Sequence, residues 1–230
     1  MNEGLQTVYP GAASSGAVAQ RNRVLRNTYW LLALSLVPTV LGAWVGITTG
    51  IVSSMGMGMS AIIFLGGAFG FIYAIERTKQ SSTGVVVLLA FTFFMGLMLS
   101  RMLAAVLGFS NGASLIMMAF GGTAAIFAAM ASLSTVIKRD LSNMGKFLFV
   151  GAIMLLVVGV INIFVQSSAL MITVAVLAIG IFSAFMLYDL KRIIDGGETN
   201  YISATLGIYL SIYNVFQSLL ALFGIFGGED

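Results

Sequence analysis

The chain alternates long uncharged apolar stretches with short links that carry most of its basic residues. Residues 27–75 and 147–188 contain no charged side chain, residues 80–137 contain only Arg101, and residues 199–228 form a last uncharged stretch. A helix needs about 20 residues to cross a hydrocarbon core of about 30 Å. Each of the first three stretches is long enough for two crossings and the last for one, so the pattern predicts an all-α, multi-pass membrane protein with seven transmembrane helices.

Composition supports this fold class and excludes several kinds of chemistry. The 230 residues are 59% hydrophobic and only 8% charged, whereas about a quarter of a soluble domain is charged. The absence of His and Cys removes thiol nucleophiles, imidazole bases and His or Cys metal sites. The apolar stretches offer one acidic residue near a helix end and no central lysine, so we expect no enzyme activity. Nothing predicts a nucleic-acid partner.

The basic residues define an orientation in the membrane. Alternate crossings bring four links to the same side, and these links hold ten of the eleven basic residues. The positive-inside rule assigns that side to the cytoplasm. We therefore expect a cytoplasmic N-terminus and a periplasmic C-terminus. The links contain Arg21, Arg23 and Arg26, then Arg77 and Lys79, then Lys138, Arg139 and Lys146, then Lys191 and Arg192.

Residues 1–27 precede the first span, and residues 28–230 are expected to form the transmembrane domain. The first 20 residues are rich in Gly, Ala and Ser and have little to pack, which predicts a disordered cytosolic tail. Two interpretations stay open for this tail: it has no role, or it is a handle that an ATP-driven unfoldase grips, starting at Met1, Asn2 and Glu3.

Asp189 lies near the end of the sixth predicted span, and a polar stripe follows on the seventh. Lipid offers such side chains no hydrogen-bonding partner, so the stripe must face protein or water. Asp189 has two alternatives: near the membrane surface it pairs with Arg192, and deeper it needs Ser211, Asn214 or a basic residue of a neighbouring helix. The stripe spans an arc of roughly 80° and consists of Ser203, Gly207, Ser211, Asn214 and Ser218.

Two further polar residues lie inside predicted spans. Arg101 is about 25 Å from the cytosolic start of its span, so it either extends to the outer headgroups or lines a pore as a gating residue. This depth argues against a direct pair with Asp189. For Asn162 we expect a hydrogen bond to a neighbouring helix.

Several segments resemble the Bax inhibitor (transmembrane BAX-inhibitor-motif) family, and the resemblance covers nearly the whole chain from Arg23 onward. The most specific are GGETNYI and SIYNVFQSLL near the end, supported by FGGTAAIFAAMA and DLSNMGKFLFVGAI. The resemblance implies a bacterial inner-membrane protein in which six helices surround a polar C-terminal one. It also implies binding by the FtsH-type membrane ATP-dependent protease, both as a slow substrate held by the cytosolic tail and as a modulator of its proteolysis.

The resemblance implies an alternative function as well, because other bacterial members are pH-sensitive calcium leak channels that use a pair of aspartates on the last two helices. The first aspartate corresponds to Asp189, but Ser211 stands at the second position. Two close carboxylates share a proton and one does not, so the pH-sensing pair is incomplete. We expect at most a weak site for calcium or protons at Asp189, and a hydrogen bond from Ser211 or Asn214 to Asp189 that closes the cytosolic end. No other cofactor is expected, and no pattern indicates an oligomeric state.

Overall fold

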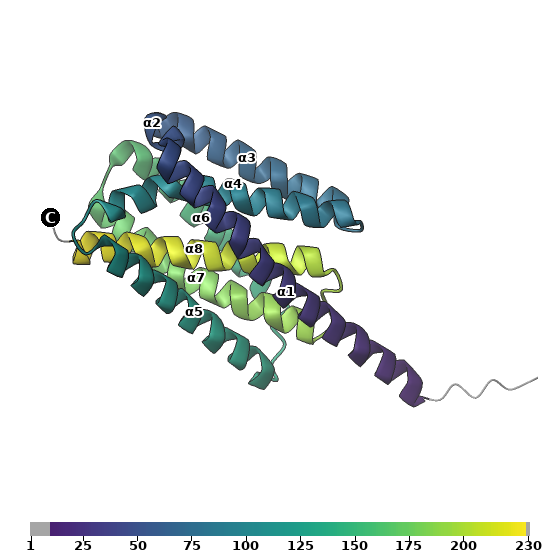
Figure 1. Cartoon of the computed structure of the whole chain (residues 1–230). Coiled ribbons are helices and arrows are strands. Elements are labelled where there is room, and N and C mark those ends of the chain that lie inside the picture. The colour runs from purple at the N-terminus through teal and green to yellow at the C-terminus, as the bar shows by residue number, and fades with distance from the viewer. Residues whose placement is uncertain (1–9, 229–230) are drawn as a thin grey trace, which may run out of the picture.

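A computed structural model describes residues 10–228, and helices account for nearly all of this part of the chain (Figure 1). It contains seven helices that are long and apolar enough to cross a membrane, and one short helix between the first two of them. No strand occurs in residues 10–228, so the predicted all-α class and the seven spans are confirmed. The helices are α1 (Pro10–Thr49), α2 (Ile51–Ser54), α3 (Met57–Thr78), α4 (Ser82–Leu107), α5 (Gly112–Val136), α6 (Met144–Val165), α7 (Ser168–Ile194) and α8 (Tyr201–Gly227).

The links between helices gather at two opposite ends of the bundle, as the charge pattern predicts. At one end the Asn200 side chain donates to the Lys79 carbonyl at 2.8 Å, and Arg21 donates to the Ile194 carbonyl at 3.2 Å. At the other end Asn111 donates to the Gly227 carbonyl at 2.5 Å. We call the first of these the basic end, because the links 79–81, 137–143 and 195–200 lie there.

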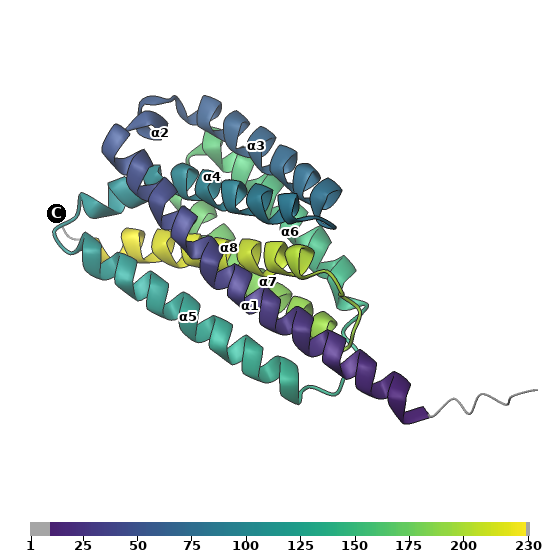
Figure 2. The same cartoon turned by 45° about the vertical axis from the view of Figure 1, so that its right-hand side comes forward.

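The N-terminal segment differs from the sequence prediction. We expected residues up to Gln20 to be disordered, but α1 begins at Pro10 and extends beyond the ends of the other helices (Figures 1 and 2). Ala, Gln and Arg favour helix, and the contact of Arg21 with α7, together with the buried Val24, holds this extension against the bundle. The predicted handle at residues 1–3 lies outside the described residues.

The C-terminal helix α8 is the best-buried element of the bundle. Twelve of its residues are buried, including Ile208, Tyr209, Val215 and Leu220. It packs most extensively against α7, α5 and α1, with smaller contacts to α4 and α3 (Figure 2). The prediction that all six other spans surround α8 is not confirmed, because α6 packs mainly on α7.

Helices α1 and α4 form the largest helix pair, and glycines allow their close approach. A Cβ atom added at Gly42 would collide with the Phe93 carbonyl, and one at Gly96 would collide with the Thr39 carbonyl. Small residues that let two backbones meet are the usual basis of helix association in lipid. Both helices of this pair also pack against α8.

Candidate functional site

The carboxylate of Asp189 lies between α7 and α8, about 8 Å from the basic end of α7 as judged from helical rise. The side chain is partly buried and faces the bare Cα of Gly207: a Cβ atom added there would lie 2.8 Å from Asp189 Oδ2. The glycine of the polar stripe therefore provides the space that the carboxylate occupies. Within the described residues the carboxylate has no hydrogen bond or ion pair.

The prediction that Ser211 or Asn214 forms a hydrogen bond with Asp189 is wrong. Ser211 donates to the Gly207 carbonyl at 3.1 Å, and Asn214 donates to the Leu210 carbonyl at 2.8 Å. Short polar side chains in a helix readily bond to the carbonyl four residues earlier. Both side chains therefore donate within α8, and neither donates to Asp189.

The predicted pair between Asp189 and Arg192 is not formed either. Arg192 Nη2 lies 3.3 Å from Glu198 Oε2 in the link after α7, and Lys191 Nζ lies 2.5 Å from Asp195 Oδ1. The link turns back at Gly196, which has a φ of 80°, and this brings acidic side chains close to the last turn of α7. These local partners compete successfully with the more deeply placed carboxylate of Asp189.

Arg101 lies at the end of the bundle opposite Asp189. Its Nη1 atom donates to the Met55 carbonyl at 3.1 Å and reaches Ser60 Oγ at 3.5 Å. The guanidinium thereby ties α4 to the connection between α2 and α3. This position separates Arg101 from Asp189, which lies near the basic end.

Asn162 makes a local contact in place of the expected bond between helices. Its Oδ1 atom accepts a hydrogen bond from the Ser167 backbone N–H at 2.9 Å. Gln166, with a φ of 52°, forms the reversal at the end of α6, and Ser167 caps α7 by accepting from the Leu170 N–H. Asn162 therefore stabilises the turn from α6 to α7.

Two buried tyrosines on α8 were missed by sequence analysis. The Tyr209 hydroxyl lies 2.9 Å from Thr39 Oγ1 on α1, and the Tyr213 hydroxyl donates to the Met95 carbonyl on α4 at 3.3 Å. Both side chains are buried. Their spacing of four residues on a helix, in a segment already known to be polar, is the signal that could have identified them.

The described residues contain no group of three or more Asp or Glu side chains arranged to hold a metal ion. Asp189 therefore offers one carboxylate, with two oxygens at most, where calcium prefers six to eight oxygens. The site offers a partly buried carboxyl group at the contact between α7 and α8. The remaining oxygens for a cation would come from water or backbone carbonyls.

Comparison with known proteins places the chain in a family. The sequence signature of the family described as "Inhibitor of apoptosis-promoting Bax1" matches residues 21–228. The chain belongs to the Bax inhibitor family. Within this family it is 37% identical over 209 residues to a protein of Escherichia coli strain K12 named "Modulator of FtsH protease YccA", covering 91% of this chain and 92% of that protein.

Other relatives in the Bax inhibitor family support a membrane location. An Escherichia coli O6:H1 protein named "Inner membrane protein YccA" shows the same 37% identity over 209 residues, with the same coverage of 91% and 92%. A Vibrio cholerae protein named "Uncharacterized membrane protein" is 37% identical over 215 residues, covering 92% of this chain and 93% of that protein. Together with seven helices of spanning length, these matches identify a multi-pass membrane protein.

Proposed function

We propose that the protein binds an FtsH-type membrane ATP-dependent protease in a bacterial inner membrane, modulates its proteolysis and is itself a slow substrate of it. The observation that carries the proposal is the likeness, over 91% of the chain, to a relative named as a modulator of that protease. The proposal includes a cytoplasmic basic end, which the positive-inside rule favours.

The shape of α1 gives this proposal a physical basis. Its 40 residues correspond to a helix of about 60 Å, roughly twice the thickness of the hydrocarbon core. The part of α1 that exceeds the length of a membrane span projects from the bundle at the basic end (Figure 1). Val18 and Arg23 are exposed in this part of the helix. An arm that leaves the bundle can enter an unfoldase, while the buried α8 and the tightly packed α1–α4 pair resist extraction, so the substrate is degraded slowly.

Deletion of residues 1–20 tests the handle. The deletion ends just before Arg21, so the hydrogen bond from Arg21 to the Ile194 carbonyl is kept. We expect the truncated protein to become stable in the presence of protease and ATP while its thermal unfolding in detergent stays the same. A matched control replaces residues 1–20 with a flexible Gly/Ser segment of equal length, which should restore degradation. Unchanged turnover of the truncated protein would exclude the handle.

Modulation is measured separately, as turnover of a second membrane substrate in the same proteoliposomes. The full-length protein should slow this turnover in proportion to its concentration. If the protease neither co-purifies with the full-length protein in mild detergent nor changes its rate on the second substrate, the main proposal fails, whatever the result of the deletion.

A cation leak pathway is the second candidate function, favoured by the unpaired carboxylate of Asp189 against Gly207. A cation crossing an apolar bundle needs a nearby negative charge, so Asp189→Asn should lower calcium flux into liposomes several-fold. The control Asp140→Asn removes the same charge from an exposed link at the same end. Flat traces from both the wild type and Asp189→Asn would eliminate this candidate.

A further inference from the structure

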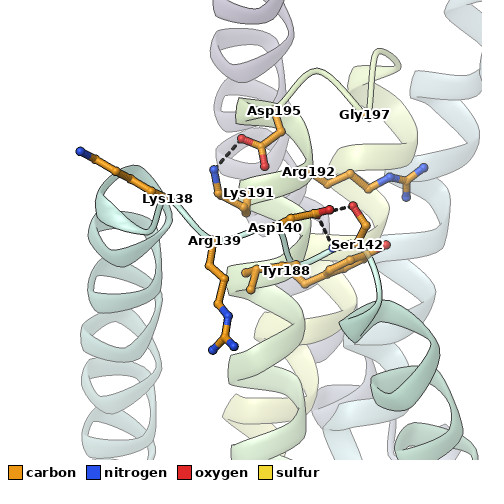
Figure 3. Close-up of a pocket in the computed structure, with 10 residues that line it drawn as sticks. Lys138, Arg139, Asp140, Ser142, Tyr188, Lys191, Arg192, Asp195 and Gly197 are labelled. Atoms are coloured by element: carbon orange, nitrogen blue, oxygen red, sulfur yellow. Dashed lines mark hydrogen bonds and ion pairs between the residues drawn. The ribbon is translucent and has the colours of Figure 1, made fainter.

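A cavity of about 490 Å³ lies at the basic end, between the link that follows α5 and the last turns of α7 (Figure 3). Its lining combines four basic side chains with two carboxylates, so the wall carries an excess of positive charge. The charged residues are Lys138, Arg139, Lys191 and Arg192 on the one hand, and Asp140 and Asp195 on the other.

The basic residues on α7 are compensated, and those on the link are not. Lys191 pairs with Asp195 at 2.5 Å, and Arg192 pairs with Glu198 at 3.3 Å. Among the described residues, Lys138 and Arg139 form no ion pair. Two cations that are neighbours in sequence are thus available to an anion that comes from outside the chain; Figure 3 shows Lys138 pointing away from α7 and Arg139 extending along it.

The second carboxylate of the cavity, that of Asp140, is hydrogen-bonded within its own link. Asp140 Oδ1 accepts hydrogen bonds from the Ser142 hydroxyl at 2.5 Å and from the Ser142 N–H at 2.8 Å. These bonds hold the pKa of Asp140 below its usual range, so Asp140 is a fixed carboxylate whose oxygen is directed to Ser142. Figure 3 shows the Arg139 side chain extending away from Asp140 and along α7.

Tyr188 contributes an aromatic side chain and a hydroxyl group to the same wall. Its ring lies against the backbone of α6, because a Cβ atom added at Gly145 would be 2.6 Å from its hydroxyl oxygen. Tyrosine is common at the membrane boundary, where one part of the ring is apolar and the hydroxyl is wet. The cavity is therefore built from a basic link and an interfacial aromatic residue.

Apolar side chains on both sides of the link fix its depth in the membrane. Val136, two residues before Lys138, is 71% exposed, and Phe147, on the first turns of α6, is 78% exposed. Such side chains lie in hydrocarbon, so the charged residues between them lie at the level of the lipid headgroups. Phospholipid phosphates are present at this level at high local concentration.

We propose that this cavity binds the phosphate of an anionic phospholipid of the adjoining leaflet, with Arg139 as one charged ligand and Lys138 as the second once its flexible side chain turns toward the cavity. Arginine recognises phosphate with two parallel hydrogen bonds, and lysine adds a compact charge. The acyl chains would lie on the exposed apolar faces of α5 and α6. This site does not depend on a protease partner or on ion conduction.

The test compares binding of phosphatidylglycerol and phosphatidylcholine by native mass spectrometry of the purified full-length protein. Removing two cations near a membrane surface weakens attraction to anionic lipid by about ten-fold or more. We expect this loss for the double variant Lys138→Gln/Arg139→Gln. The control Arg23→Gln/Lys146→Gln removes two exposed charges at the same end that do not line the cavity. It should weaken binding clearly less than the test variant, because charges outside the cavity attract the phosphate only through screening solvent.

Two further measurements keep the result interpretable. The charge-conserving variant Lys138→Arg/Arg139→Lys should retain most of the binding, and each variant should unfold at the wild-type temperature in phosphatidylcholine nanodiscs. Equal affinity of the wild type for the two lipids, or equal loss in the test and control variants, would overturn the proposal. Equally tight binding of soluble glycerol 3-phosphate would overturn the assignment to a lipid and point to a free phosphate compound.

Discussion

Helices α6 and α8 are both long enough to span the membrane, yet they occupy opposite environments. None of the residues of α6 is buried, and Phe147, Met154 and Phe164 are all more than 60% exposed. In contrast, α8 has twelve buried residues, although it carries more hydroxyl and amide side chains than α6. The more apolar helix faces outward and the more polar one lies inside, because lipid accepts methyl groups but gives hydroxyls no partner.

This contrast predicts that the same truncation has different consequences in the two helices. Tyr213→Ala removes a buried ring and its hydrogen bond to the Met95 carbonyl, so we expect the free energy of unfolding to fall by about 3–5 kcal/mol. Phe164→Ala in α6 removes a ring that is 81% exposed, and we expect a loss below about 1 kcal/mol. Denaturant titration in bicelles measures both values.

Tyr213→Phe separates the ring from the hydroxyl and should cost about 1 kcal/mol. If Phe164→Ala destabilises the protein as much as Tyr213→Ala, then α6 is packed against another protein surface in the conditions of the assay. That result would break the assignment of α6 to the lipid-facing layer.

The seven spans could be predicted from sequence because a single energy dominates their placement. Charged side chains are excluded from hydrocarbon, so the positions of charged residues such as Arg77, Lys138 and Lys191, together with the lengths of the uncharged stretches, indicate where helices must end. This argument needs only distances along the chain. It does not use the identity of neighbouring helices, and it therefore holds without knowledge of the packing.

The absence of a hydrogen-bond or ion-pair partner for Asp189 within residues 10–228 could not be predicted, because it depends on how the helices rotate and on which competing groups are near. Ser211 bonds to its own helix, and Arg192 is drawn to Glu198 across a turn that Gly196 makes possible. Several interactions of similar energy were available to each group. The helical start of α1 was missed for a related reason: its composition indicated a tail, but Arg21 finds a carbonyl acceptor on α7.

Glycine replacements test the same contrast between α8 and α6, and we expect them to change the free energy of unfolding by less than the tyrosine truncation does. Gly207→Ala in α8 would place a methyl group 2.8 Å from Asp189 Oδ2, so we expect a loss of about 1–3 kcal/mol from overpacking. Gly159→Ala in α6 meets no atom within 4 Å and should be neutral or stabilising by up to about 1 kcal/mol, because alanine favours helix.

The double variant Gly207→Ala/Asp189→Ala identifies the cause of the loss. If the methyl group acts through the carboxylate, removing that carboxylate restores part of the stability, and a double-mutant cycle gives a coupling energy above about 0.5 kcal/mol. Strict additivity would mean that Gly207 is needed for another reason, and the contact with Asp189 would lose its significance.

The smallest effect is expected at the start of each helix, where α6 and α8 both begin after an asparagine. Asn200 accepts hydrogen bonds from the Ile202 and Ser203 N–H groups at 2.9 and 3.1 Å, whereas Asn143 makes no side-chain cap bond. We expect Asn200→Ala to cost about 1 kcal/mol and Asn143→Ala to cost almost nothing. Hydrogen exchange of the first turn of each helix provides a local measurement.

Because Asn200 also donates to the Lys79 carbonyl, faster exchange in Asn200→Ala should extend to the start of α4. Confinement of the change to α8 would show that the buried helix is anchored by its own cap alone.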